Sequence, residues 1–334
     1  MQDPNDSTAR PVGRTSSRRP DVALIGRTGG RYGTIIGLLA LCVFFALKSP
    51  VFLSKDNFLG ILNASAVNGI IATGLTVTLV MLEFDLSVGY IANTAGMYAA
   101  GWARDIGTSW AFLLAILVGV VIGVANGVIV TVLLVSAFIA TLGMGLVLQG
   151  VIYGYTGGSQ IVDLPSDFAT VGIGEILGVH YIVWIMAGTM LLTWLMLAHT
   201  PLGRQMYAIG GNAAAARLSG INVRRVRVLA FAISGAMSAL GGVLLASNLN
   251  AGQPSAATGY LFDAFTACFI GAATLRDGEF HVLGTLVGVL ILGVLANGLI
   301  LVDVGPSWQI AIKGLFLIGA VALSGVLRRR TVAA

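Results

Sequence analysis

Charged residues are scarce in this sequence of 334 residues. They make up 10% of the chain, whereas 57% of its residues are hydrophobic. Soluble domains carry charge at roughly a quarter of their positions, so the composition excludes that class and predicts an all-α polytopic membrane protein. The 45 glycines agree with this class, because small residues let transmembrane helices approach one another closely.

Cysteine and histidine are scarce as well. Cys42 and Cys268 both lie in apolar runs, and the three histidines fall at the ends of such runs, so neither a disulfide framework nor a metal site is expected. The sequence contains no His-Glu-x-x-His helix and no Gly-x-Ser-x-Gly elbow. The glycine-rich stretch Gly26–Gly33 lacks the Gly-Lys-Ser/Thr ending of a phosphate-binding loop. We therefore expect no catalytic or nucleotide site on this chain.

About ten apolar stretches are long enough to cross a membrane, which takes ~20 residues of helix. We place them at residues 33–53, 58–81, 84–102, 109–133, 137–156, 179–199, 226–248, 257–275, 281–301 and 306–327. The charge-free run from Ala111 to Tyr155 is twice as long as one span, so we break it near Val135 and Ser136. The third stretch begins close to Asp85, and its alternative is a broken or re-entrant helix.

Positive charges fall between alternate stretches. With the N-terminus inside, 15 of the 19 Lys and Arg residues are cytoplasmic, as expected for short basic loops, and so is the C-terminus. The chain then divides into a disordered tail at 1–31, a membrane domain at 32–327 and a cytoplasmic C-terminal tail at 328–334. The net charge of +5 reflects this topology and a weak attraction to the lipid bilayer, and it gives no reason to expect nucleic acid.

Two of the stretches share a pattern. The fourth reads VGVVIGVANGVIV over Val118–Val130, and the ninth reads VGVLILGVLANGLIL over Val287–Leu301. The ninth span lies five spans after the fourth, an odd number, so the two cross the membrane in opposite directions, as in the inverted-topology repeats of transporters. We predict that spans two to five repeat as spans seven to ten. The alternative is a chance match between stretches that are all rich in Gly, Val, Leu and Ala.

Several polar residues fall within or beside the apolar spans. Each costs ~2 to 3 kcal/mol at mid-bilayer unless it faces protein or water. These residues are Asn63, Asn68, Asp85, Asn93, Asn126, Gln149, Asp263, Asn297, Gln309 and Lys313. We interpret most of the amides as hydrogen-bonding partners between helices. Asp85 is expected to cap or break a helix, and Asp263 is a candidate partner for Lys313.

One polar, basic segment interrupts the apolar sequence between spans six and seven, from Tyr207 to Arg227. Asn212 is a good N-cap, the AAAARL that follows favours helix, and Gly220 suits a left-handed helix end. The resulting helix of two turns is not stable alone in water and needs something to pack against. We predict that it docks another protein. The alternative is an ordinary connection whose arginines only fix the topology.

Residues 200–227 read TPLGRQMYAIGGNAAAARLSGINVRRVR. This run resembles the coupling segment of the permease subunits of bacterial ABC importers of the ribose and monosaccharide group. The resemblance continues in FDLSVG at 84–89, in AFIATLG at 137–143 and in the long motif at 234–264. It therefore covers nearly the whole chain after the N-terminal tail, with several motifs in the right order.

The resemblance implies a permease of the bacterial inner membrane that imports a small polar solute, with a monosaccharide such as a pentose or hexose as the first expectation. It implies three kinds of partner: cytoplasmic ATPase subunits that hold ATP and Mg, a periplasmic binding protein, and a second permease copy or close paralogue. No cofactor is expected on this chain itself. The implied ATPase-coupling residues are Gly203, Arg204, Gly210, Gly211, Asn212, Ala213, Ala214, Ala215, Ala216, Arg217, Leu218, Ser219 and Gly220.

Spans five and ten are expected to line the pathway because of their places in the repeat. This expectation selects Phe138, Thr141, Gln149 and Gln309. Two other classes stay open at the level of sequence. An ion-coupled secondary carrier would share the repeat but needs acidic groups at mid-membrane, and a structural subunit of a larger complex would not need the capped helix.

Overall fold

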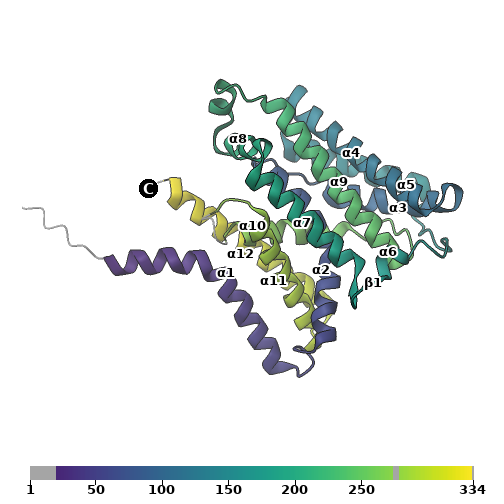
Figure 1. The fold of residues 1–334 in the computed structure, drawn as a ribbon, viewed down its shortest axis with the longest axis horizontal. Coiled ribbons are helices and arrows are strands. Elements are labelled where there is room, and N and C mark those ends of the chain that lie inside the picture. Colours follow the sequence, from purple (N-terminus) through teal and green to yellow (C-terminus); the bar gives the residue numbers. More distant parts are fainter. Residues whose placement is uncertain (1–19, 274–277, 333–334) are drawn as a thin grey trace, which may run out of the picture.

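The computed structural model describes residues 20–273 and 278–332, with side chains over 34–273 and 278–322, and within these ranges the fold is helical apart from one small hairpin (Figure 1). Residues 1–19 of the expected tail at 1–31, Arg276 and the last two residues lie outside the described residues. The helices are α1 (Pro20–Lys48), α2 (Lys55–Leu79), α3 (Val88–Ile106), α4 (Thr108–Val132), α5 (Ala137–Thr156), α6 (Thr170–Ile173), α7 (Tyr181–His199), α8 (Pro201–Leu218), α9 (Val223–Leu249), α10 (Thr258–Ala272), α11 (Val282–Leu301) and α12 (Pro306–Val332). The hairpin pairs β1 (Glu175–Ile176) with β2 (Val179–His180) in antiparallel register.

Six of the described helices are long and apolar enough to cross a membrane, namely α2, α4, α5, α7, α9 and α11. The other four expected spans coincide with α1, α3, α10 and α12. The expected break in the long charge-free run is confirmed, because α4 ends at Val132 and Ser136 caps α5 through a hydrogen bond from the Ile139 N–H.

The structure differs from the expected spans at both ends and around the third one. Helix α1 begins at Pro20, so residues 20–31 are helical, and α12 continues to Val332. The third helix starts at Val88 and not at residue 84, because an irregular segment, residues 80–87, follows α2. That segment includes Leu82 at a positive φ of 62°.

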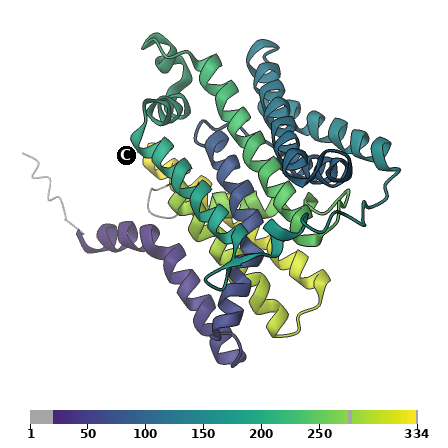
Figure 2. The same ribbon diagram turned by 45° about the vertical axis from the view of Figure 1, so that its right-hand side comes forward.

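The helices of the two halves pack crosswise. Helix α4 lies along α9, and α11 lies along α2, as Figures 1 and 2 show from two sides. Glycine makes these close approaches possible: a side chain at Gly123 would meet the backbone of Phe231 on α9, and one at Gly293 would meet Ser65 on α2. Such small residues are how helices associate where lipid offers no hydrophobic driving force.

The connection between α5 and α7 covers one end of this bundle. It carries α6 and the β1–β2 hairpin and is fixed to the end of α9. The Ser247 hydroxyl donates to the carbonyl of Phe168 at 2.7 Å and accepts from the Gly172 N–H at 2.8 Å. Helix α8 lies at the opposite end of α9 (Figures 1 and 2).

Candidate functional site

Helix α8 contains a break at Asn212, which divides it into two helical pieces. Asn212 has extended backbone angles (φ −158°, ψ 101°) within an otherwise helical run. Its Oδ1 accepts hydrogen bonds from the N–H groups of Ala214 and Ala215, each at 3.0 Å. This geometry satisfies two donors that a helix start leaves open, so Asn212 is the N-cap of the short helix that ends at Leu218.

The short helix ends in the motif that its sequence suggests. Gly220 has a φ of +83°, a conformation that costs glycine little and other residues more. Its N–H donates to the Arg217 carbonyl, and the Ile221 N–H donates to the Ala216 carbonyl, both at 3.1 Å. These two bonds form a Schellman motif, which gives partners to carbonyls that the helix end leaves free.

One face of α8 is fastened to the body of the protein. Gly203, Met206, Ile209 and Ala216 are buried. A side chain at Gly210 would collide with the carbonyl of Val80, in the irregular segment that follows α2. The piece of α8 before Asn212 is therefore fixed to the body of the protein, and the short helix after it buries one side at Ala216.

A second anchor joins α8 to another connection. The Tyr207 hydroxyl donates to the carbonyl of Phe280, just before α11, at 3.2 Å. Helix α8 thus touches the chain before α3 and the chain before α11.

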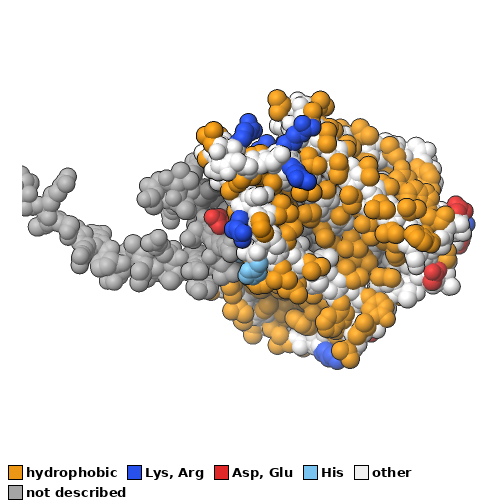
Figure 3. Space-filling view, turned by 45° about the horizontal axis from the view of Figure 1, so that its top comes forward, with side chains coloured by type: hydrophobic (Ala, Val, Ile, Leu, Met, Phe, Trp, Pro, Cys, Tyr) orange, Lys and Arg blue, Asp and Glu red, His pale blue; other side chains and the backbone are white. Residues whose placement is uncertain are grey.

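The opposite face of α8 is free within the described chain. Ala214, Ala215, Arg217 and Ser219 are exposed, and Leu218 is 92% exposed. Arg204, Arg224 and Arg225 are exposed nearby, and Figure 3 shows basic side chains gathered beside a broad hydrophobic surface. The four expected glycines differ in their surroundings: Gly203 and Gly210 are closely packed, Gly211 has nothing near it, and Gly220 forms the helix end.

The irregular segment 80–87 is held by buried polar contacts. Asp85 is fully buried; its Oδ1 accepts from the Ser87 N–H at 3.0 Å and its Oδ2 from the Ser234 hydroxyl of α9 at 2.8 Å. The Asn126 amide of α4 donates to the Ser87 hydroxyl at 2.9 Å. Asp85 therefore lies at a helix break, as expected, and together with Ser87 it joins α3, α4 and α9.

An ion pair lies beside this network. Arg227 Nε of α9 is 2.8 Å from the Glu83 carboxylate, and both side chains are largely buried. Burial raises the pKa of Glu83, and the guanidinium of Arg227 opposes that shift. The pair joins the irregular segment to the start of α9, next to the end of α8.

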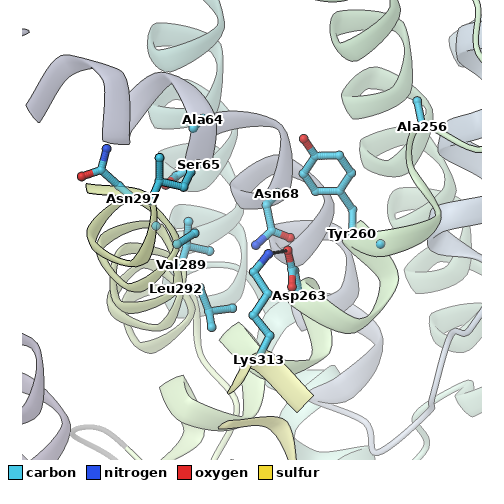
Figure 4. Close-up of a pocket in the computed structure, with 14 residues that line it drawn as sticks. Ala64, Ser65, Asn68, Ala256, Tyr260, Asp263, Val289, Leu292, Asn297 and Lys313 are labelled. Atoms are coloured by element: carbon cyan, nitrogen blue, oxygen red, sulfur yellow. Dashed lines mark hydrogen bonds and ion pairs between the residues drawn. The ribbon is translucent and has the colours of Figure 1, made fainter. Parts of the chain in front are cut away.

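A cavity of about 300 Å³ lies between α2, α10, α11 and α12. Lys313 Nζ of α12 is 2.8 Å from Asp263 Oδ2 of α10, so the candidate partner named from sequence is the actual one. Figure 4 shows this pair with Asn68 and Tyr260 beside it. The polar and charged side chains of the lining are Ser65, Asn68, Tyr260, Asp263, Asn297 and Lys313.

The four residues predicted for the pathway lie elsewhere. Phe138 and Gln149 are exposed on α5, whereas Thr141 is buried and its hydroxyl accepts from the Leu86 N–H at 2.9 Å. Gln309 donates to the Val304 carbonyl at the start of α12. The sequence marked Asn68, Asn297 and the charged pair as intramembrane polar residues, but spacing alone did not show that they share a cavity. Within the described ranges, no group of three or more His, Cys, Asp or Glu side chains is placed to hold a metal.

Comparison with known proteins gives consistent matches over most of the chain. Residues 57–321 match the family described as the permease component of branched-chain amino acid transport systems. The chain is 39% identical to the ribose import permease RbsC of Haemophilus influenzae, covering 91% of this chain and 95% of that protein.

Two further relatives come from Escherichia coli K12. Ribose import permease RbsC is 40% identical over 86% of this chain and 91% of its own length. The L-arabinose transport system permease AraH is 31% identical over 89% of this chain and 90% of its own length. No solved structure gives a significant match.

Proposed function

The chain belongs to the permease family of branched-chain amino acid transport systems, and we propose that it carries a small neutral sugar of the ribose type. It is the permease subunit of an ABC importer, a multi-pass protein of the bacterial inner membrane, and a transport component with no catalytic role. The sugar assignment rests on relatives whose names specify ribose and L-arabinose import.

The coupling site for the partner ATPase is the segment from Gly203 to Gly220. The single observation that carries this proposal is the division of α8 into a buried face that is fixed to two connections and an exposed face that includes Leu218. A force applied to the exposed face would reach the α2–α3 segment through Gly210 and the chain before α11 through Tyr207. ATP and Mg would be held by the ATPase.

The proposed topology has ten spans, with both termini in the cytoplasm and with spans two to five repeated as spans seven to ten. The crosswise packing supports the repeat, since α4 lies on α9 just as its counterpart α11 lies on α2. The ion pair between Glu83 and Arg227 also fits, because this topology puts both residues at the cytoplasmic side. Residues 32–327 would form one membrane domain.

A second permease copy or close paralogue would complete the pathway, and a periplasmic binding protein would deliver the sugar. Helices α5 and α12 would face the other copy, which keeps Phe138, Gln149 and Gln309 as predicted pathway residues. Thr141 is instead buried within the protomer, where it bonds the segment before α3. Large exposed apolar side chains on both helices, among them Leu146, Trp308 and Ile318, support this arrangement. These helices need either lipid or another subunit against them.

The test is reconstitution of the permease into liposomes with its ATPase and binding protein. We expect uptake of radiolabelled D-ribose that requires ATP hydrolysis and stops when the ATPase is left out. Uptake that is driven by a proton or sodium gradient in liposomes lacking the ATPase would contradict the proposal and favour a secondary carrier.

A further inference from the structure

The cavity between α2, α10, α11 and α12 contains polar atoms without partners. Ser65 Oγ, Asn68 Oδ1 and Asn297 Oδ1 are buried and form no hydrogen bond with any residue that the structure describes. Ser65 and Asn68 are only 4% and 6% exposed. Buried polar groups in native proteins nearly always have a partner. Ser65, Asn68 and Asn297 all belong to the lining of one cavity, so a polar molecule that enters it is the nearest source of these hydrogen bonds after a change of side-chain rotamer.

The charges around the cavity select the kind of molecule. Asp263 and Lys313 are the charged residues of the lining, and they neutralise each other at 2.8 Å. A charged solute would have to displace one partner and leave the other charge buried without a counter-ion, which is costly. A neutral solute leaves the pair intact.

The shape and chemistry of the lining favour a small polyhydroxyl compound. A volume of about 300 Å³ is at the lower end for small-molecule pockets, which range from about 300 to 1,000 Å³. Each Asn amide offers both a donor and an acceptor, as a sugar hydroxyl does. The ring of Tyr260 adds an apolar surface next to these amides (Figure 4).

The position of the cavity argues for water and solute in it, and against lipid. Ionisable groups within membrane domains face the bundle interior or a water-filled space. Lys313 and Asp263 both lie on helices that coincide with expected spans. The cavity that they line is therefore unsuited to lipid acyl chains.

We propose that this cavity holds one molecule of a small neutral sugar during transport, with Asn68, Asn297 and Ser65 bound to its hydroxyl groups. This assignment rests on the proposed function of the chain as a sugar permease. It adds a solute site within a single protomer, formed by α2, α10, α11 and α12, to the pathway between two copies.

The experiment measures ATP-driven uptake of D-ribose in liposomes that contain the permease, its ATPase and an excess of ribose-loaded binding protein. With that protein saturated, the rate reports on the permease. We expect Asn68→Ala and Asn297→Ala each to lower the rate roughly tenfold, and Ser65→Ala about threefold, since each removes a hydrogen bond to the solute. Co-purification with the ATPase checks that each variant is assembled.

Asn63→Ala is the matched control, because Asn63 lies on the same helix as Asn68 but does not line the cavity. Its side-chain oxygen also has no hydrogen-bond partner within the described part of the chain. We expect its uptake rate to stay close to the wild-type rate. Wild-type rates in the assembled Asn68→Ala and Asn297→Ala proteins, or an equal loss in Asn63→Ala, would overturn the inference and leave the proposed function intact. If Asn68→Ala does not assemble, the smaller change Ser65→Ala decides in the same way. Failure of the wild-type protein to take up ribose would overturn both.

Discussion

Nε of Arg227 lies 2.8 Å from the carboxylate of Glu83, so the N-terminal part of α9 is joined to the irregular segment between α2 and α3. The exposed fractions of the two side chains are 26% and 12%. Gly210 of α8 packs on the same segment through the Val80 carbonyl. The segment is therefore the common contact of α8 and α9. Under the coupling role proposed for α8, it is the part of the membrane domain that α8 would move first.

The ion pair predicts a measurable coupling between its members. Glu83→Gln and Arg227→Gln should each lower the free energy of unfolding by about 1 to 3 kcal/mol, between the values for exposed and buried pairs. The double variant should lose less free energy of unfolding than the sum of the two single losses, because its second substitution has no ion pair left to break. Thermal unfolding of the purified permease in detergent measures all three. Strictly additive losses would show that the pair contributes nothing as a pair.

Two adjacent glycines give a matched comparison. Gly210→Ala should impair ATP-driven uptake and lower stability by about 1 to 3 kcal/mol, because the new methyl group collides with the Val80 carbonyl. Gly211→Ala should behave like the wild-type protein, since nothing lies near Gly211. Uptake rates and thermal midpoints of the two variants check this. Equal behaviour would mean that the contact with Val80 is unimportant.

The Asn212 cap predicts that its removal weakens the short helix and its binding of the ATPase. Asn212→Ala removes two hydrogen bonds from backbone N–H groups and should destabilise the short helix by about 1 kcal/mol. Asn212→Asp should keep most of the stability of the helix, because Asp is also a good N-cap. Binding of the ATPase, measured by co-purification, should fall in the alanine variant. The control is Asn222→Ala, which removes the cap of α9 through Arg225 without touching the short helix. A larger loss of ATPase in the control would contradict this account.

Local chemistry made much of this structure predictable from sequence. The bounds of α5 are those expected from apolar length, and the roles of Asn212 and Gly220 follow from residues within three or four positions of each. Long-range contacts were harder to predict. The amides of Asn68 and Asn297 share a cavity only because α11 packs on α2, and hydropathy does not specify the rotation of a helix. The pairing of Asp263 with Lys313 was the one long-range contact of the cavity that the sequence suggested, because the spans contain few charged residues that could pair.

The most direct test of the account is whether the exposed face of α8 binds the ATPase. Leu218→Glu places a charge on that face, and Leu177→Glu makes the same change at a leucine of the β1–β2 turn that is 89% exposed, against 92% for Leu218. Co-purification with the ATPase and ATP-driven uptake of D-ribose should both be lost in Leu218→Glu, while Leu177→Glu should keep the ATPase. A Leu218→Glu protein that retains both its ATPase and its uptake would contradict the claim that α8 couples the two.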